Sequence, residues 1–446
     1  MYLGALVSLL LLDTAVEAWA ITITGWPWLK TGKNALYALI AITVAVQVIR
    51  QRRWREFTTP ADIALLVFTG TLALSAVLSD APATQAAQGS YVYLRAAVVF
   101  YALRVLRPGP PWIRRVTIGA LTWAGLNAVL ALIQIVAGPT AYTMMGWNDL
   151  EMALIHRAQG LYPHPNDLGH LLGLTVVGLF AWLMFRGWHW PSAAMLLLCA
   201  AGLAATQSRE SLLGAGAAII VVAVKMRLPV RKAATVLAVM SVLALLPLTL
   251  LPGARAEVAR RATGLGTALG LNIAQPAADL SLPECGPPPP VHTVKGSQCR
   301  RTEPEQEIRV VFAKQSFVLL QQRPITGYGP GTFGGSVALA QDPQWNRHPR
   351  FGPGGFSLHG FHGRTVDSFL LHLLVEAGLL GLSAFLAWFW FLTRTPRVPS
   401  LWTVLAPAAI AFALITAVFS NALEGAPLPP LIFAIAGLAW TSASTD

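Results

Sequence analysis

Long apolar runs recur along almost the whole chain, and they constrain its fold more than any other feature. Each is close to the roughly 20 residues that an α-helix needs to cross the hydrocarbon core of a bilayer. The runs lie at 2–24, 34–50, 61–79, 90–106, 116–137, 167–185, 191–207, 210–225, 233–251, 367–392, 400–420 and 428–443. Only 12% of the 446 residues are charged, about half the share usual in soluble domains. The sequence therefore predicts an all-α integral membrane protein with about twelve transmembrane helices.

The distribution of basic residues predicts which side of the membrane each loop faces. Lys and Arg in short loops stay on the cytoplasmic side, and the pattern fits best if both termini are cytoplasmic. The loops then placed inside hold Arg50, Arg52, Arg53, Arg55, Arg104, Arg107, Arg114, Arg115, Arg186, Lys225, Arg227, Arg231, Lys232, Arg394 and Arg397. The short outside loops hold only Lys30, Lys33, Arg157 and Arg209. Topology thus explains most of the formal charge of +12, and we expect no nucleic-acid partner.

One long interruption separates the ninth and tenth expected spans. We expect transmembrane helices one to nine in residues 1–251, a loop domain outside the membrane in residues 252–365, and helices ten to twelve in residues 366–446. Cys285 and Cys299 both fall in this loop, so an oxidising compartment would let them form a disulfide.

The second half of the loop contains a predicted helix and a glycine-rich turn. Ile308, Val311 and Phe312 begin an apolar pattern at helical spacing, which predicts an amphipathic helix near 303–322 that Pro324 ends. The stretch that follows, "ITGYGPGTFGG", has five glycines in eleven residues. Its conformation is therefore set by backbone angles that glycine adopts easily.

Ionisable residues at the start of the tenth span are candidates for chemistry. In "TVDSFLLHLLVEAGLLG", residues 365–381, His372 and Glu376 are four apart and share a helix face. Glu376 lies roughly 13 Å below the helix start, at 1.5 Å per residue. We expect this pair to stabilise the bundle, with Glu376 bonded to His372 or to a backbone group.

Asp367 differs from this pair because it lies at the membrane interface, near a helix N-terminus that stabilises a carboxylate. It can cap the helix or act as a catalytic carboxylate, and the sequence leaves both roles open. His359, His362 and Arg364 precede it closely. We take Asp367, His359 and His362 as candidate catalytic residues and Arg364 as a candidate substrate contact.

Arginines at the outer edge of the membrane run against the orientation rule, so each needs a partner. Arg157, Arg209 and Arg309 each lie in or beside an irregular outside segment. A polyprenyl diphosphate would explain all three, because guanidinium groups pair bidentately with phosphate oxygens; headgroup contacts or local ion pairs are the alternative. Asn166, in a turn that starts a helix, is a further candidate substrate contact. Arg95 lies about six residues into span four, where it can contact substrate or extend to the surface.

The order of these segments resembles the O-antigen ligase and polymerase superfamily of bacterial membrane glycosyltransferases. The matching stretches are Arg157, Gly160, "HPND" (164–167), "SRES" (208–211), the loop helix with Arg309, "RPITGYGPGTF" (323–333) and "DSFLLHLLVEAGLLG" (367–381). The resemblance covers most of the chain. It implies a multi-pass helical bundle in the bacterial inner membrane, capped by a periplasmic loop domain, with the active site facing the periplasm.

The resemblance also implies an activity: transfer of a glycan from undecaprenyl diphosphate to an acceptor sugar hydroxyl, without a metal or other cofactor. Ligases use lipid A-core as the acceptor, whereas polymerases use another lipid-linked repeat unit. The implied partners are therefore the lipid-linked donor, one of these acceptors and membrane lipid, and a chain-length regulator is a further candidate. Arg209 and Arg309 match arginines thought to hold the diphosphate in this family, and we add Arg157 to them.

The last motif departs from the ligase pattern. Ligases typically show His, then Asn, Ser or Gln, then nine residues, then Gly-x-x-Gly. Here Gly378 and Gly381 have the same spacing from the first two positions, but those positions are Asp367 and Ser368. Polymerase-like members accept Asp there, so we expect a polymerase of O-antigen or exopolysaccharide repeat units, with a ligase as the alternative. His359 or His362 could replace the missing histidine.

A membrane transporter is the rival class. The span count supports it, as do polar residues inside expected spans, namely Asp62, Asn127, Gln134, His170 and Glu376. However, most spans lack charges near mid-membrane, where a coupling site should lie. An outside loop of this length is also unnecessary for transport. We therefore favour the enzyme.

Overall fold

The computed structural model describes residues 2–26, 28–229, 231, 308–358, 365–395, 400–425 and 427–441. Its longer helices are α1 (Tyr2–Thr24), α2 (Trp28–Arg50), α3 (Pro60–Leu78), α4 (Ala83–Leu94), α5 (Ala97–Leu106), α6 (Pro110–Ala137), α9 (Pro165–Arg186), α10 (Trp190–Thr206), α11 (Arg209–Lys225), α14 (Ile308–Gln322), α16 (Phe369–Leu392), α17 (Leu401–Phe419) and α18 (Leu428–Thr441). Short helical segments are η1 (Trp54–Phe57), α7 (Pro139–Met144), α8 (Glu151–Leu154), α15 (Ser336–Gln341), η2 (Trp345–Arg347) and η3 (Pro349–Phe351). No strand occurs in these residues.

Many of these helices are long and apolar enough to cross a bilayer. By length and composition seven qualify, or up to eight if α4 and α5 form one span bent by 49°. The chain is thus an all-α, multi-pass membrane protein. The stretch 191–225 divides into α10 and α11, whereas the span expected at 233–251 lies outside the described residues.

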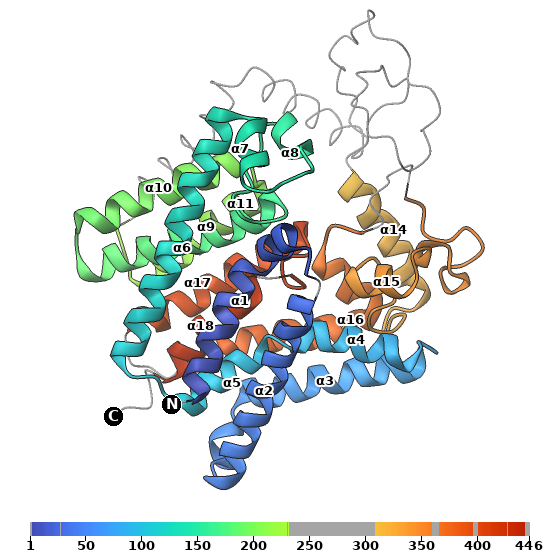
Figure 1. Cartoon of the computed structure of the whole chain (residues 1–446). Helices are drawn as coiled ribbons and strands as arrows, with labels where there is room; N and C mark the ends of the chain where they lie inside the picture. Colours follow the sequence, from blue (N-terminus) through green and yellow to red (C-terminus); the bar gives the residue numbers. More distant parts are fainter. Residues whose placement is uncertain are drawn as a thin grey trace, which may run out of the picture.

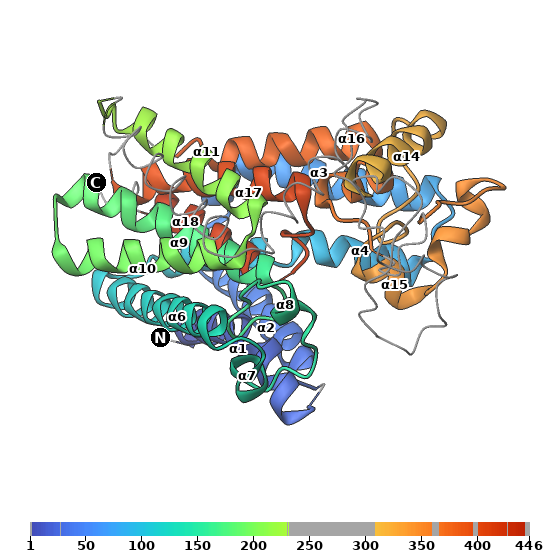
Figure 2. The same ribbon diagram turned by 90° about the horizontal axis from the view of Figure 1, so that it is seen from above.

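The long helices pack into one bundle with a cap at one end. Helix α11 packs on α17, α16 on α3, and α9 on α10. Figures 1 and 2 both place α14 and α15 at the same end of the bundle, beside the ends of α4 and α16. Phe68, Phe385 and Trp388 are fully buried between α3 and α16, with ring centroids 5.4–6.1 Å apart. Such aromatic packing stabilises the pair of helices beyond the area it buries.

Helix α16 is broken at Gly378, whose φ of 65° lies in the left-handed region. The break frees backbone groups that bond to the chain after α14. Leu379 N–H donates to the carbonyl of Pro324 at 2.9 Å, and Leu380 N–H to that of Ile325 at 3.2 Å. A Cβ on Gly378 would lie 2.2 Å from the Ile325 oxygen, so only glycine fits this crossing.

Candidate functional site

Three helix N-termini meet at the capped end of the bundle. The start of α9 touches the start of α11, because a Cβ on Gly169 would lie 2.7 Å from both Ser208 Cβ and Ser211 Oγ. The start of α16 is tied to the end of α17, since Phe369 N–H donates to the Ser420 carbonyl at 3.1 Å. His170 Nε2 lies 3.4 Å from Ser420 Oγ and so links α9 to this junction. Helix N-termini carry partial positive charge, which favours an anion nearby.

Arg309 and Asp367 come together at this end. Arg309, in the first turn of α14, places a guanidinium nitrogen 3.9 Å from the Asp367 carboxylate, and their side chains are 29% and 47% exposed. Asp367 does not cap α16: Ser368 does, because its hydroxyl accepts from Leu371 N–H at 3.2 Å. The capping role that the sequence left open therefore belongs to Ser368, and the Asp367 carboxylate faces an arginine and solvent.

Arg157 holds the loop that precedes α9. Its Nε donates to the Thr206 carbonyl at 3.1 Å, and a terminal nitrogen donates to Asn166 Oδ1 at 2.8 Å. At least two of its donors are therefore engaged by the protein. Arg157 and Asn166, both predicted to contact substrate, are brought together, and Arg157 also ties the end of α10 to the start of α9.

Two buried amides fix the same loop from inside the membrane domain. Gln134 Oε1 accepts from Gln159 N–H and Gly160 N–H at 2.9 and 2.8 Å. Asn127 Oδ1 accepts from Leu161 N–H at 2.9 Å. Gly160 adopts a left-handed φ of 56°. These span amides are thus committed to shaping a loop, and they no longer support a transport pathway.

The first residues of α11 place Arg209 on the surface beside a buried carboxylate. Arg209 is exposed at the first position of the helix. The next residue, Glu210, is 3% exposed, and its Oε1 has no hydrogen-bond partner in the described part of the chain. A buried carboxylate oxygen without a hydrogen-bond partner is costly.

Arg95 lies at a different point, at the bend between α4 and α5. It donates to the backbone carbonyl of Glu424 and lies 6.0 and 5.8 Å from the ring centroids of Tyr37 and Tyr91. These contacts give the intramembrane guanidinium protein partners. Its contacts are thus with α2, α4 and the segment before α18.

Several candidate residues fall outside the described residues. They are His359, His362, Arg364, Cys285 and Cys299. Within the described part of the chain the one cysteine, Cys199, is buried and unpaired. No group of three His, Cys, Asp or Glu side chains able to hold a metal ion occurs there either.

The glycine-rich loop, residues 326–335, packs against α16 and is held by Glu376. Glu376 accepts from Tyr93 hydroxyl at 2.6 Å, Gly331 N–H at 2.7 Å and Phe333 N–H at 2.9 Å. Its own carbonyl accepts from Gly329 N–H at 2.8 Å. Glu376 therefore bonds to backbone groups and to a tyrosine, and its role in the described structure is to position the loop.

A second carboxylate fixes the far end of this loop. Glu424 accepts from the N–H and hydroxyl of Ser336 at 3.2 and 3.3 Å and from His372 Nδ1. His372 Nε2 donates to the Val366 carbonyl at 2.7 Å, one residue before Asp367. Sequence spacing gave no sign of Glu424, because it lies 52 residues from His372.

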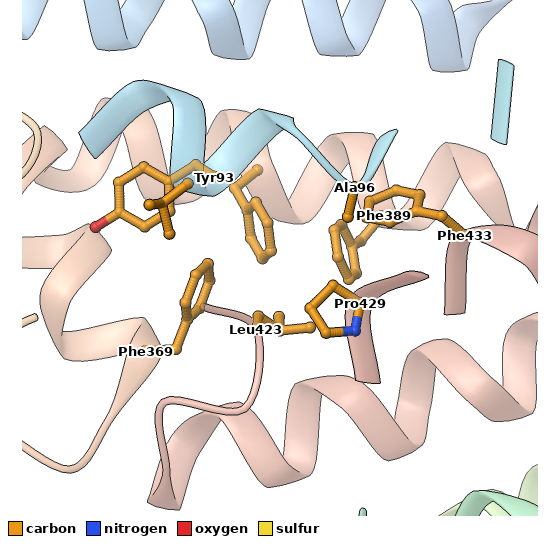
Figure 3. A pocket seen from close by; sticks show the side chains of 9 residues that line it. Tyr93, Ala96, Phe369, Phe389, Leu423, Pro429 and Phe433 are labelled. Carbon is orange, nitrogen blue, oxygen red and sulfur yellow. The ribbon is translucent and has the colours of Figure 1, made fainter. Parts of the chain in front are cut away.

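Two small cavities lie elsewhere, and neither is lined by Arg157, Arg209, Arg309 or Asp367. One lies between α4, α5, α16 and α18; it measures ≈ 10 Å³ and is lined by Tyr93, Phe369, Phe433 and other apolar side chains. Figure 3 shows the Tyr93 hydroxyl pointing away from it. Such a space holds about one water. Of the three arginines at this end, Arg209 is exposed, whereas Arg157 and Arg309 are half-buried.

These features define a polytopic helical membrane protein with arginines, helix N-termini and an interfacial carboxylate gathered at one end. The model of the family described as "O-antigen ligase" matches residues 194–386. That match includes Arg209, Arg309 and Asp367, and it supports the resemblance to the O-antigen ligase and polymerase superfamily over these residues. No curated protein matches the chain significantly.

Proposed function

We propose that this protein is an inner-membrane glycosyltransferase that moves a glycan from undecaprenyl diphosphate to an acceptor sugar hydroxyl at the periplasmic face. The family match supports a glycosyltransferase-like enzyme of the O-antigen ligase and polymerase type. The contact that supports the proposal most directly is that of Arg309 with Asp367, 3.9 Å apart beside the starts of α9, α11 and α16. In the proposal Arg309 is the anion-binding group and Asp367 is the base.

In the proposed reaction the arginines bind the diphosphate, which is the leaving group. As the bond between the anomeric carbon and the phosphate oxygen breaks, its electron pair goes to that oxygen, and Arg309 and Arg209 stabilise the added charge. The acceptor hydroxyl attacks the same carbon and loses its proton to Asp367. Direct displacement inverts the anomeric configuration, and the scheme needs no metal.

Binding of the diphosphate also releases the Asp367 carboxylate from Arg309. Arg309 and Asp367 are partly exposed and 3.9 Å apart, a separation that is loose for an ion pair. A doubly charged diphosphate competes for the guanidinium, and the freed carboxylate can then accept a proton from the acceptor. This exchange of partners is why we assign the base to Asp367, since Ser368 rather than Asp367 caps α16.

We favour a polymerase that joins lipid-linked repeat units, because Asp367 stands where ligases have histidine. We further propose that the chain has about twelve spans with both termini in the cytoplasm, and that Cys285 and Cys299 form a disulfide. His359 and His362 are proposed as further site residues, and Arg364 and Arg95 as substrate contacts. A ligase is the second candidate, and the description of the matching family as O-antigen ligase favours it.

Reconstitution of the full chain in lipid vesicles separates these functions. The vesicles receive lipid-linked single repeats labelled in the sugar, with or without lipid A-core. A polymerase extends the single repeats into a ladder on the lipid carrier without lipid A-core. A ligase transfers label only when lipid A-core is present. Absence of transfer in both mixtures would remove the glycosyltransferase proposal.

A further inference from the structure

His164 caps α9 through one ring nitrogen, and this fixes where its proton lies. Its Nδ1 accepts from the backbone N–H of Asn166 at 3.1 Å. A ring nitrogen that accepts a hydrogen bond carries no proton, so the neutral ring is protonated on Nε2. His164 is exposed, and no hydrogen bond from Nε2 is found among the described residues. The ring therefore presents an N–H donor to solvent.

The groups around His164 belong to the proposed donor site. Arg157 bonds to Asn166, two residues away, at 2.8 Å. Although the ring reaches solvent, protein surrounds it on several sides. This burial, and then the positive charge of Arg157, lower the pKa of His164; His170 and Arg309 act in the same direction, and Glu210 opposes them. The imidazole is thus neutral at neutral pH and lies within electrostatic reach of Arg309.

We propose that His164 is a catalytic residue that donates a hydrogen bond from Nε2 to the diphosphate of the bound glycan donor. This inference rests on the proposed function and adds a neutral donor to the charged arginines. The bonds made and broken are those of the displacement above: the acceptor proton goes to Asp367, and His164 keeps its own proton. Its N–H stabilises charge that grows on the departing oxygen.

His164 is not a replacement for the histidine missing at position 367. A general base needs an unprotonated nitrogen facing the acceptor, but the free nitrogen of His164 carries the proton. The unprotonated nitrogen is occupied by Asn166 N–H at 3.1 Å. Becoming a base would require the ring to change tautomer and give up the helix cap.

Two substitutions separate the cap from the donor. In His164→Asn the side-chain oxygen can still accept from Asn166 N–H, because Asn is among the best N-cap residues, but nothing reaches the position of Nε2. In His164→Gln the amide nitrogen reaches about as far as Nε2, whereas the cap is weakened. A residue that only caps the helix tolerates Asn and is impaired by Gln; a hydrogen-bond donor shows the reverse order.

The test measures initial rates of glycan transfer by the full chain in vesicles, with unfolding temperatures as the control. We expect His164→Asn to unfold near the wild-type temperature and to transfer about 10- to 100-fold more slowly. His164→Gln should keep a rate within about threefold of wild type despite its weaker cap. A wild-type rate in His164→Asn, or equal losses in both variants, overturns the proposal.

A second measurement uses only the wild-type fold. In the chain labelled with ¹⁵N-histidine, the His164 signals, assigned with either variant, should report a neutral Nε2–H ring that shifts on addition of inorganic pyrophosphate. An Nδ1–H ring, or no shift at saturating pyrophosphate, contradicts the inference. If the wild type transfers no glycan, the proposed function fails instead; if it transfers and these results are negative, only the role of His164 fails.

Discussion

Replacing Glu376 by Gln should loosen the glycine-rich loop without unfolding the bundle. The carboxylate accepts three hydrogen bonds, from Tyr93, Gly331 and Phe333, over 2.6–2.9 Å. A glutamine has one oxygen, which can keep the two bonds now made to Oε2. Its amide nitrogen then faces Phe333 N–H, which loses its acceptor.

The size of the effect follows from that single lost acceptor. Glu376 is 2% exposed and Phe333 is fully buried, so water cannot readily replace the bond. A buried donor left without a partner costs about 1–3 kcal/mol. At about 1.36 kcal/mol for each factor of ten, local opening of the loop becomes roughly 5- to 150-fold more frequent.

Hydrogen exchange measured by mass spectrometry reads this opening directly. Peptides that cover residues 326–336 should exchange faster by that factor, whereas peptides from α17 should not change. Glu151→Gln is the matched control, because Glu151 is exposed at the start of α8. Unchanged exchange in the loop, or an equal increase throughout the protein, would refute the reasoning.

Other positions give independent expectations. Gly378→Ala should destabilise the protein by at least about 1–3 kcal/mol, because its left-handed φ is strained for alanine and its Cβ would overlap Ile325. Gly70→Ala, inside α3, where a Cβ meets nothing within 4 Å, should not lower the unfolding temperature. Gln134→Leu removes the acceptor of two backbone N–H groups and should lower both that temperature and the transfer rate. Because the pKa of His164 is lowered, the ring should stay neutral as pH falls through 6.5, the usual value for histidine. The ¹⁵N signals of His164 should therefore still report a neutral Nε2–H ring at pH 6, and a ring that gains a proton with a midpoint near pH 6.5 would contradict this.

The class of fold could be predicted because membrane insertion depends on local composition. A run of about 20 apolar residues is recognisable without knowledge of its neighbours, and the described helices follow the runs closely. The number of spans is harder to predict, since α10 and α18 are apolar but short. The break at Gly378 was also missed, because its cause is a carbonyl more than fifty residues earlier in the chain.

The candidate site could be predicted where arginines lie on the outer side of the membrane, against the orientation rule. Arginines at the outer edge of a membrane demand a partner, and one of them, Arg309, lies beside Asp367. Hydrogen-bond partners that are distant in the sequence could not be predicted in this way. His372 bonds to Glu424 rather than to Glu376, and Asn127 and Gln134, which first suggested transport, bind a loop. His164 appeared in the sequence only within the stretch "HPND" (164–167), with no role of its own.

Glycan transfer by Asp367→Asn tests the central claim most directly. The variant keeps the size of the side chain and the Ser368 cap, so we expect it to fold. It should bind pyrophosphate at least as tightly as the wild type does, because Arg309 no longer has a charged partner at position 367. Without a base, its initial rate in vesicles should fall by about 10²- to 10⁴-fold. A folded Asp367→Asn chain that transfers glycan at the wild-type rate would contradict the account.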